Sequence, residues 1–522
     1  MTKATVLLTG ATGFIGSHLL RVLTPVGNII TLGRRPAGGT AHIPFDLAEE
    51  SKSRAPEIAR VPAGAILVHA AAAVRRSQSD DSDAVRYRRI NVDGTSKLLE
   101  ALETRLPSYI VYVSTTDVYA TSITPISESS PVGPATPYAT SKLEAEELVL
   151  AFGRARRIPV GVARFGSIYG PGEESFGKLI PTAIRAAISR QPIPLIGEGA
   201  ALRDVLFVDD AARAVRAMLA RKATGIYNVL SGNPVSVIQV VTAINSLTRN
   251  PAGVWFVDRS AAEFNRVFAP SNLRTFGWEP KTPLPVGLKH EIVASLKQRP
   301  IVAIDLDGTL LDHWTRMYRL YRDYLVARRI IPLTPAAYRS QKRGGKSEAA
   351  IVTAVLAKSE VAGYLAWKRK HIEDWGLLCT DTLNDQTLTL LGSLNRRFRV
   401  VLVTSRHSPR LLKRQLQRLS IQEQFFKVIA VGGEDSPTAK ADVLQALQGE
   451  SEETIWYIAD SEEDISAARR AGVRVAVVSW GLRGAAFLRK QKPDRLIRRA
   501  DTSVDLAYRR ALCTGRGILV AQ

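Results

Sequence analysis

Two aspartates, Asp305 and Asp307, directly follow an apolar run in the segment "IVAIDLDGTLL", which begins at Ile301. The apolar run predicts a buried strand, and Gly308 allows a sharp turn after it. Two carboxylates at the end of one strand can share a divalent cation such as Mg²⁺, which prefers oxygen ligands. Taken alone, the pair is also compatible with a capped loop that does no chemistry.

Further polar groups stand at or near the ends of later strand-like runs in the same half of the chain. Thr404 ends "VVLVTS", Lys440 stands in "PTAKADVL", and "YIADSEEDI" contains Asp460 and Asp464. Carboxylates at the ends of neighbouring strands can share a metal ion. The set therefore favours an active site over a capped loop.

A different pattern stands near the start of the chain. Gly10, Gly13 and Gly16 in "VLLTGATGFIGSHLL" follow a predicted strand and open a predicted helix. Glycines in this context let the backbone approach a pyrophosphate, and the helix N-terminus supplies positive potential. A glycine fingerprint alone is a weak signal, so neighbouring motifs have to support it.

Tyr138 and Lys142, in "PYATSKLEAEEL", lie four residues apart on a predicted helix and therefore share a face. An ammonium group beside a phenol can lower the phenol's pKa and make it a usable base. The alternative is an ordinary surface tyrosine and lysine.

Alternating strands and helices must position both groups of residues. The first half alternates short apolar strands with amphipathic helical stretches, which is typical of βαβ units and of a parallel sheet covered on both faces. A new buried strand at Ile301 restarts the pattern, so we expect a domain boundary near residues 298–300. The segment 312–397 reads as helical, and strands resume after it. The sequence thus predicts a two-domain α/β protein, residues 1–297 and 298–522, with a helical insertion in the second domain.

Composition limits the class of protein. The chain has 522 residues, a formal net charge of +22 and two cysteines, Cys379 and Cys513. It has no apolar run of membrane-spanning length, its N-terminus enters a strand without a charged leader, and two cysteines cannot make a disulfide framework. We expect a cytoplasmic protein without a membrane partner.

The positive charge has two readings. Arginine pairs such as Arg156-Arg157 and Arg469-Arg470 are spread through both halves without interleaved aromatic residues. A nucleic-acid-binding protein would concentrate its charge in one patch or stripe. The distribution favours a solvated surface that attracts anionic small molecules, and no nucleic-acid partner is expected.

Residues 1 to about 297 resemble an extended short-chain dehydrogenase/reductase of the sugar-nucleotide epimerase and dehydratase branch, which has an NAD(P)-binding Rossmann fold with a doubly wound parallel sheet. The phrases that carry the resemblance follow the family's order: "TGATGFIG", "FDLAEE", "LVHAAA", "NVDGTSKLLEA", "YVSTTDVYA", "PYATSK", "RFGSIYGPG" and "ALRDVLFVDDAARAV". The cofactor-binding residues that the resemblance implies are Gly10, Gly13, Phe14, Ile15, Gly16, Arg34, Arg35, Asp46, Leu47, Ala70, Ala71, Tyr138 and Lys142.

The same resemblance implies the catalytic roles in the first domain. Thr115 would orient and polarise a substrate hydroxyl or carbonyl, Tyr138 would exchange the proton, and Lys142 would bind the cofactor ribose and tune the tyrosine. Hydride would pass to or from the nicotinamide. The resemblance also allows a homodimer through this domain.

The end of the second predicted strand bears on the cofactor. It reads "TLGRR", with Gly33 where an NAD enzyme usually carries an acid for the ribose hydroxyls. Arg34 and Arg35 follow and could receive a 2′-phosphate. NADP is therefore favoured as the cofactor, with NAD as the alternative.

The chain departs from the family at positions that affect the substrate. Dehydratases of the family carry adjacent Asp and Glu after the catalytic threonine, whereas this chain has Thr116 and Asp117. The family's asparagine in "RFGSIYGPG" is Ser167, Arg203 is retained as a phosphate ligand, and only Arg266 remains of a later clamp. Oxidation, reduction or epimerisation is therefore favoured over dehydration, and a simpler phosphorylated sugar or polyol becomes an alternative to a nucleotide sugar.

Residues 299 to about 485 resemble the haloacid dehalogenase superfamily, a Rossmannoid fold, and the stretch of about 315–395 resembles its inserted helical cap. The resemblance implies hydrolysis of phosphate esters with Mg²⁺. Asp305 would attack phosphorus and form an aspartyl phosphate. Asp307 would protonate the leaving alcohol and then activate water.

The other motif residues take supporting roles in this resemblance. Thr404 and Lys440 would hold the phosphoryl oxygens. The metal ion would be bound by Asp305, the backbone carbonyl of Asp307 and Asp460. The role that the resemblance implies for Asp464 is support of Lys440 or of the metal.

One further motif is misleading. "RGGKS" around Lys346 is similar to a phosphate-binding Walker loop, but Ser340 stands where the first glycine is required and no strand precedes it. Gly344 and Gly345, with Arg343 and Lys346, are expected either to form a cap turn that faces an anionic substrate or to be a solvated turn.

These expectations combine into a bifunctional enzyme that acts on one phosphorylated small molecule in two steps. The first domain would perform redox chemistry or epimerisation on a phosphorylated sugar, polyol or nucleotide sugar, and the second would remove phosphate. The alternatives are a sugar-nucleotide dehydratase joined to a phosphatase, and a catalytically degenerate scaffold that binds RNA.

Overall fold

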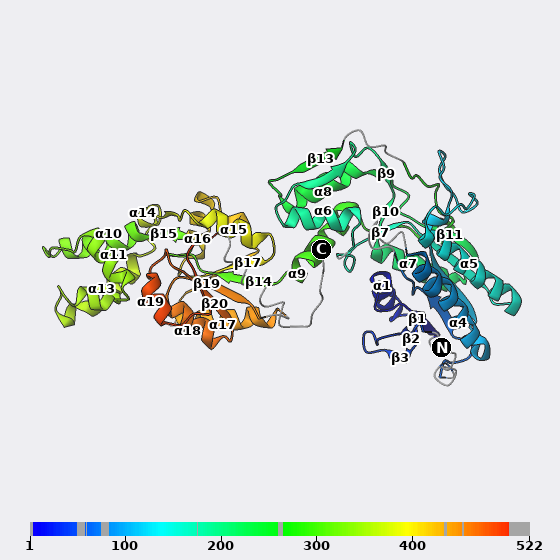
Figure 1. The fold of residues 1–522 in the computed structure, drawn as a ribbon, viewed down its shortest axis with the longest axis horizontal. Coiled ribbons are helices and arrows are strands. Elements are labelled where there is room, and N and C mark those ends of the chain that lie inside the picture. Colours follow the sequence, from blue (N-terminus) through cyan, green and yellow to red (C-terminus); the bar gives the residue numbers. More distant parts are fainter. Residues whose placement is uncertain are drawn as a thin grey trace. The chain divides into compact units, whose positions relative to one another are not determined.

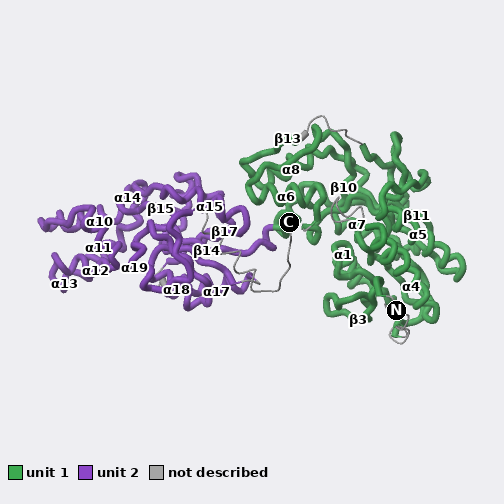
Figure 2. The backbone as a smooth tube through the Cα atoms, in the orientation of Figure 1, with its two compact units in different colours: residues 1–295 green, residues 296–522 purple. Residues whose placement is uncertain are grey.

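The chain folds into two α/β units. The computed structural model describes residues 4–49, 58, 60–74, 83–174, 176–258, 265–432, 436–451 and 454–500. The division between the units falls between Ser295 and Leu296 (Figure 2), close to the boundary expected from the sequence. Residues 501–522 of the expected second domain lie outside the described part of the chain.

Unit 1 is built on a seven-stranded sheet in which every described strand pair is parallel. In spatial order the strands are β11 (Gly225–Val229), β6 (Val160–Phe165), β5 (Tyr109–Thr115), β4 (Ile66–His69), β1 (Thr5–Thr9), β2 (Asn28–Gly33) and β3 (Ala41–Pro44). The order reverses direction between β1 and β4. In doubly wound sheets, ligands bind in the crevice at the carboxyl ends of such a strand pair.

Helices cover both faces of this sheet (Figure 1), as the βαβ pattern predicted. One face carries α1 (Phe14–Leu23) and α7 (Val208–Arg221), whose apolar residues share a core cluster with β1. The other face carries α4 (Gly94–Ala101) and α5 (Pro137–Arg156), which pack in a second cluster. The doubly wound Rossmann-like fold is therefore confirmed.

The remaining elements lie in unit 1, except that the last helix, α9, extends past Ser295 into unit 2. They are α3 (Ala84–Tyr87), the π-helical turn η2 (Arg88–Asp93), η3 (Leu102–Arg105), η4 (Thr116–Val118), β7 (Ser167–Tyr169), α6 (Leu179–Ile188), β8 (Ile193–Ile196), β9 (Leu202–Arg203), β10 (Val205–Phe207), β12 (Val235–Ser236), α8 (Val237–Thr248), β13 (Val254–Asp258), η5 (Asn272–Phe276) and α9 (Leu284–Gln298). The strands among them form three small two-stranded sheets. Within the described residues of the whole chain, no helix has the length and apolar character needed to cross a bilayer.

Unit 2 contains a six-stranded parallel sheet. In spatial order its strands are β18 (Lys427–Val431), β17 (Arg399–Ser405), β14 (Ile301–Ile304), β19 (Trp456–Ala459), β20 (Arg474–Val478) and β21 (Arg495–Ile497). Apolar residues of α17 (Ser436–Gly449) and α18 (Glu462–Arg470) pack in one core cluster, and those of α15 (Thr387–Asn395) and α16 (Pro409–Arg418) pack in another. The remaining elements are η6 (Gln422–Gln424) and α19 (Ala485–Lys490).

A helical cap is inserted after the first strand of unit 2. Its helices are α10 (Trp314–Val326), α11 (Pro335–Arg343), α12 (Glu348–Val352), α13 (Lys358–His371) and α14 (Trp375–Leu378), and α10 to α13 share an aromatic-rich core of their own. The chain enters and leaves the cap through β15 (Leu311–Asp312) and β16 (Thr382–Leu383), which pair as an antiparallel ladder. The expected cap extended to about residue 395, but α15 packs in a core cluster of the main sheet instead.

Candidate active sites

The glycine loop of unit 1 has no room for side chains. Gly10 has φ +75°, and a Cβ atom there would lie 2.7 Å from the amide nitrogen of Ala71. A Cβ atom on Gly16 would overlap the carbonyl oxygen of Gly10. Gly13 begins α1 without a side-chain cap, so the first turn of the helix can present its amides to an anion. This geometry suits a dinucleotide pyrophosphate.

A buried histidine links the glycine loop to the next strand end. Thr95 Oγ1 donates its proton to the carbonyl of Asn91 (2.6 Å), so it must accept from His69 Nε2 (2.9 Å). His69 Nδ1 then accepts from Thr9 Oγ1 at 2.7 Å, and Thr9 Oγ1 accepts from the amides of Ala70 and Ala71. Burial, with the charge of Lys142, lowers the pKa of His69 to about 3, which keeps the ring neutral.

Asn91, in the π-helical turn, continues this network toward α5. Its side chain accepts from the amide of Ala73 at 2.7 Å and donates to the carbonyl of Ala73 and to Ser141 Oγ. Ser141 Oγ in turn donates to the carbonyl of Tyr138 at 2.8 Å. His69 and Asn91 were not assigned roles from the sequence, although both stand in motifs that carried the family resemblance.

Thr115, at the end of β5, lies beside Tyr138 on the first turn of α5. Their side chains are hydrogen-bonded; Thr115 is buried, and Tyr138 is partly buried. Burial and the charge of Asp117 raise the pKa of Tyr138, while the hydrogen bond from Thr115 opposes the rise. The structure places Thr115 beside Tyr138, as the family resemblance implied. The pKa of the Tyr138 phenol, however, lies above its ordinary value, whereas the sequence analysis expected Lys142 to lower it.

Lys142 is not among the groups that shift the pKa of Tyr138, for which burial is the largest cause. Its ammonium group donates to the carbonyl of Val113 at 2.8 Å and lies 4.2 Å from the centre of the Tyr112 ring. Burial lowers the pKa of Lys142 to about 7, although the charge of Glu146 opposes the change. The lysine is thus buried on the same helix as Tyr138, and burial weakens the positive charge that it can bring to the phenol.

The residues that the sequence analysis connected with the choice of substrate differ in their surroundings. Arg266 donates to the Asp117 carboxylate and to the Thr116 carbonyl, both at 2.5 Å. Arg203 donates to the carbonyl of Leu202, and Ser167 is exposed on β7. The carboxylate that takes the place of the dehydratase acid is therefore held in an ion pair.

Arg34 and Arg35 are exposed after β2. A Cβ atom on Gly33 would meet nothing within 4 Å, so the position next to them is open. Asp46 follows β3 and accepts from the amide of Ala48 at 2.9 Å. These residues lie at the same carboxyl edge of the sheet as the glycine loop.

In unit 2 the predicted residues gather at the ends of three neighbouring strands, β17, β14 and β19. Lys440 Nζ donates to Asp305 Oδ1 at 2.9 Å and to Asp464 Oδ1 at 2.7 Å. Tyr457 and Ser461 also donate to Asp464. Burial raises the pKa of Asp305 to about 7 against the opposing charge of Lys440, whereas Lys440 and hydrogen bonds hold the pKa of Asp464 below its usual range.

Asp460 completes a carboxylate cluster. Carboxylate oxygens of Asp305, Asp460 and Asp464 all lie within 4.8 Å of one another. Burial and the two neighbouring carboxylates raise the pKa of Asp460 well above its ordinary value, so a divalent cation would relieve the crowding. The cluster therefore fits Mg²⁺, which the family resemblance implied. Gly308 is required here, because a Cβ atom on it would overlap the Asp460 carboxylate.

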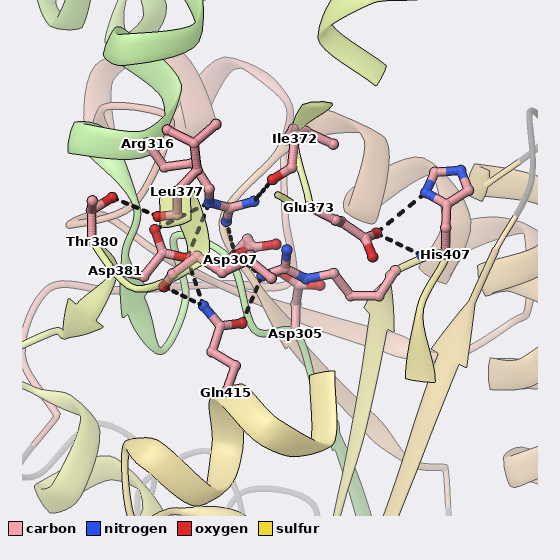
Figure 3. Close-up of polar contacts among 12 residues, drawn as sticks. Asp305, Asp307, Arg316, Ile372, Glu373, Leu377, Thr380, Asp381, His407 and Gln415 are labelled. Carbon is pink, nitrogen blue, oxygen red and sulfur yellow. Dashed lines mark hydrogen bonds and ion pairs between the residues drawn. The ribbon is translucent and has the colours of Figure 1, made fainter. Parts of the chain in front are cut away.

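The Asp307 side chain lies outside that cluster. Arg316 Nη2 and Arg406 Nη2 donate to its Oδ1 atom at 2.6 and 2.8 Å. Although burial opposes them, the two guanidinium groups hold the pKa of Asp307 well below its usual range. Figure 3 shows Asp307 and Arg316 next to Asp381. Neither arginine was predicted as a site residue from the sequence.

Thr404 and the "RGGKS" turn, which the sequence analysis also considered, have different hydrogen-bond partners. Thr404 is buried, and its hydroxyl oxygen has no hydrogen-bond partner within the described residues, which leaves it able to bind a phosphoryl oxygen. Arg343 donates to the carbonyls of Ser479 and Gly481, whereas Lys346 is exposed. The "RGGKS" turn follows helix α11, not a strand, so the Walker reading stays excluded.

The comparisons with known proteins agree with the two folds. A sequence profile of the NAD dependent epimerase/dehydratase family matches residues 6–229, and one of haloacid dehalogenase-like hydrolases matches residues 302–478. A dTDP-glucose 4,6-dehydratase of Neisseria gonorrhoeae is 30% identical over 331 residues, 56% of this chain and 95% of the relative.

Two further relatives resemble unit 1. A trifunctional UDP-glucose 4,6-dehydratase, UDP-4-keto-6-deoxy-D-glucose 3,5-epimerase and UDP-4-keto-L-rhamnose reductase of Arabidopsis thaliana is 28% identical over 59% of this chain. The match spans only 49% of that relative's length. Among solved structures, an epimerase from Methanothermobacter thermautotrophicus is 28% identical, with a TM-score of 0.51 over 56% of this chain and 92% of the other.

The fold and these comparisons define two enzyme-family domains in one chain, a short-chain dehydrogenase/reductase domain followed by a haloacid dehalogenase-like domain. The chain belongs to the NAD dependent epimerase/dehydratase family through unit 1, and its second unit is a haloacid dehalogenase-like hydrolase domain.

Proposed function

We propose that the chain is a bifunctional enzyme. Unit 1 performs NAD(P)-dependent oxidation, reduction or epimerisation of a sugar, and unit 2 hydrolyses a phosphate monoester with Mg²⁺. The observation that carries the hydrolase half is the buried cluster of Asp305, Asp460 and Asp464 around Lys440. The family membership and the Thr115–Tyr138 pair support the other half.

In unit 1, the residues of this chain bind and orient the reactants. The glycine loop and the first turn of α1 hold the dinucleotide, whose nicotinamide supplies hydride chemistry when bound. Thr115 orients the reacting hydroxyl or carbonyl, and the Tyr138 hydroxyl exchanges its proton. The Thr9–His69–Thr95–Asn91–Ser141 network keeps the glycine loop and the catalytic helix in register.

Nucleotide sugars are the substrates that the names of the relatives favour, since two of them are dehydratases of dTDP- or UDP-glucose. Dehydration is disfavoured in this chain for two reasons. Thr116 replaces one of the family's acids, and Asp117, which stands in place of the other, is ion-paired with Arg266. The proposed reaction is therefore oxidation, reduction or epimerisation. Its substrate is a nucleotide sugar or a simpler phosphorylated sugar or polyol.

NADP is proposed as the preferred cofactor. The exposed Arg34 and Arg35 and the open space at Gly33 fit a 2′-phosphate better than free ribose hydroxyls. The lack of a carboxylate at Gly33 removes the group that would hold those hydroxyls in an NAD enzyme.

In unit 2, Asp305 is the nucleophile. Lys440 and the hydroxyl of Thr404 hold the phosphoryl oxygens while Asp305 attacks phosphorus and the P–O bond of the ester breaks. Mg²⁺ would be held by Asp305, Asp460 and the carbonyl of Asp307, and it neutralises phosphoryl charge when bound. Asp307 is the proposed acid and base: it would take up a proton as the bound ester displaces its ion pairs with Arg316 and Arg406, give that proton to the leaving oxygen, and later take one from the water that releases phosphate.

The hydrolase half is tested with Asp305→Asn, which keeps the side chain's size but removes its nucleophilic charge. Hydrolysis of 4-nitrophenyl phosphate with Mg²⁺ should fall by roughly three orders of magnitude or more, and a chelator should abolish it in the unmutated enzyme. Tyr138→Phe is the matched control in the other unit and should leave this hydrolysis intact. Equal rates in Asp305→Asn and the unmutated enzyme would contradict the proposal.

The remaining parts of the proposal concern the setting of the reaction. A phosphorylated small molecule that is converted by both units would explain their fusion. A homodimer through unit 1 and a cytoplasmic location are proposed with it. Incubating one candidate sugar phosphate with NADPH, Mg²⁺ and each single-site variant would show whether the two steps act on the same compound.

A further inference from the structure

Arg266 contacts the turn at the end of β5 in unit 1, residues 115–118, which we call the catalytic turn. Its Nη1 atom donates to Asp117 Oδ1 and its Nη2 atom donates to the carbonyl of Thr116, both at 2.5 Å. The amide of Asp117 donates to Thr115 Oγ1 at 3.2 Å, so Thr115 is the N-cap of η4. One guanidinium group therefore holds both residues that follow Thr115.

The backbone around Arg266 is fixed on both sides. The amide of Arg266 donates to the carbonyl of Leu202 in β9 at 3.2 Å. The carbonyl of Val267 accepts from the amide of Ile126 at 3.0 Å, and the amide of Ala269 donates to the carbonyl of Ile126 at 2.8 Å. These hydrogen bonds set the position from which the guanidinium group reaches the catalytic turn.

The ion pair of Arg266 and Asp117 is partly exposed, with 36% and 43% of the two side chains accessible to solvent. A pair of this kind adds little to the free energy of unfolding, because water screens the charges and long side chains lose entropy when they pair. The sequence analysis connected Arg266 with a substrate clamp, but a substrate anion would have to compete with Asp117 for the guanidinium group. The contacts of Arg266 thus favour an effect on the turn that it holds.

The catalytic turn matters because Thr115 is hydrogen-bonded to Tyr138. A threonine hydroxyl can accept one hydrogen bond and donate its own proton in another, so Thr115 can accept from the Asp117 amide and donate to the phenol oxygen. Donation to the oxygen favours the ionised phenol. That form takes the hydroxyl proton when a substrate alcohol gives its hydride to the nicotinamide. The position of Thr115 therefore bears on proton exchange at Tyr138.

Titratable groups from three other elements and from its own helix surround Tyr138. They are Asp117 in η4, Tyr87 in α3, Tyr112 in β5 and Lys142 one turn along α5. Burial is the largest cause that raises the pKa of Tyr138, the charge of Asp117 adds to the rise, and the hydrogen bond from Thr115 opposes it. Loss of the Thr115 bond should therefore raise this pKa further.

We infer that Arg266 is a positioning residue for proton exchange in unit 1, because it grips Asp117 and the Thr116 carbonyl and thereby keeps the Thr115 hydroxyl against the Tyr138 hydroxyl. This inference rests on the role proposed for Tyr138. It implies that loss of Arg266 impairs proton exchange without changing the dinucleotide site, which is built on β1 and α1.

The ionisation of residue 138 can be measured without a substrate. The full chain is prepared with 2,3,5-trifluorotyrosine in place of Tyr138, because this phenol ionises several pH units lower than tyrosine and fluorine NMR then reports one position. Arg266→Gln should raise the midpoint pH of the titration by about one unit, the size of one lost hydrogen bond to a charged group. Thr115→Val should raise it by a similar amount. Arg266→Lys should raise it less, because an ammonium group keeps the charge beside Asp117 but lacks the fork that also holds the Thr116 carbonyl.

A double-variant cycle shows whether Arg266 acts through Thr115. In a Thr115→Val background, Arg266→Gln should raise the midpoint by less than about 0.3 units, because the hydroxyl that it positions is already gone.

Arg156→Gln is the matched control. Arg156 pairs with Glu103, and the two side chains are 45% and 37% exposed, which is similar to the pair of Arg266 and Asp117. Arg156 ends α5, whereas Tyr138 stands at the start of that helix. The variant removes the same charge from a similar pair far from Tyr138, so it should leave the midpoint unchanged.

The outcomes separate this inference from the proposed function. Quenching of intrinsic fluorescence by NADPH and NADH tests the dinucleotide site by itself, and a chain that binds neither would contradict the function proposed for unit 1. If the unmutated chain binds a dinucleotide but Arg266→Gln leaves the midpoint unchanged or lowers it, only the inference about Arg266 is overturned. A full rise in the Thr115→Val background would overturn it too. Should circular dichroism show Arg266→Gln to be unfolded, Arg266→Lys decides: a rise of about half a unit that disappears in the Thr115→Val background supports the inference, and no rise contradicts it.

Discussion

Gly10→Ala should weaken cofactor binding strongly, for two physical reasons that can be separated. The residue has φ +75°, and a non-glycine residue in that region costs about 1–2 kcal/mol. The new Cβ atom would also lie 2.7 Å from Ala71 N and 2.9 Å from the carbonyl carbon of Ala70, which are backbone atoms that cannot turn aside. Overpacking of this kind costs about 1–3 kcal/mol.

The two contributions together amount to roughly 2–5 kcal/mol, which would raise the Kd for the dinucleotide about 30-fold or more if the loop has to move to bind it. The assay is quenching of intrinsic fluorescence on titration with NADPH and NADH, accompanied by urea unfolding. Gly39→Ala is the control, since Gly39 has φ +68° and a Cβ atom there meets nothing within 4 Å. The Gly39→Ala variant should show only the cost of placing a non-glycine residue at a positive φ. The reasoning fails if Gly10→Ala binds the dinucleotide as tightly as Gly39→Ala does.

Two further predictions concern unit 1. NADPH should bind more tightly than NADH, and Arg34→Ala combined with Arg35→Ala should remove the difference in affinity. Fluorescence titrations that show equal affinities for the unmutated protein would contradict the NADP proposal. Burial, reinforced by the charges of Glu173 and Glu174, raises the pKa of Glu291 from its ordinary 4.5 to about 9. Between these two values the folded chain binds a proton that the unfolded chain releases. The free energy of unfolding should therefore fall as pH rises from about 5 to 9. Glu291→Gln should therefore leave Tm nearly unchanged at pH 5 and raise it by several degrees at pH 8.5, and a difference in Tm that does not grow with pH would refute the assignment.

The strand-end residues could be predicted because of how parallel sheets are built. Asp305, Thr404 and Asp460 come from segments far apart in the chain, yet β14 lies between β17 and β19, so the three strand ends are neighbours. The carboxyl ends of parallel strands lie at one edge of the sheet, and apolar runs followed by polar residues mark those ends in the sequence. The glycine loop was predictable for a similar reason, since it follows β1 at the point where strand order reverses.

Arg316 could not be predicted in this way. The helix reads "WTRMYRLYR", and Arg316, Arg319 and Arg322 recur at a spacing that puts all three near one helix face. In the structure Arg316 is buried against Asp307, whereas the other two are exposed. Only the packing of the cap on the core distinguishes them, and no local pattern encodes that contact. Arg406 is similar, because an arginine after a strand is ordinary.

The ionisation of Tyr138 also depends on tertiary surroundings. Spacing correctly places Tyr138 and Lys142 on one helix, but it does not specify what the ammonium group contacts. The carbonyl of Val113 and the ring of Tyr112 come from β5, and burial by that strand lowers the pKa of Lys142. Sequence spacing predicts proximity, whereas the direction of a pKa shift follows from burial and from the nearest charges.

The β15–β16 ladder gives the cap a single point of attachment in the chain. Leu311 pairs with Leu383 and Asp312 with Thr382, so the cap's first and last residues emerge side by side. The entropic cost of closing an insertion grows only slowly with its length. Exchange of the segment between Asp312 and Thr382 for a cap of different size would therefore leave the register of the catalytic strands unchanged. One contiguous stretch of gene therefore encodes the whole cap, so the cap can be exchanged as a unit to test the substrate range of the proposed hydrolase.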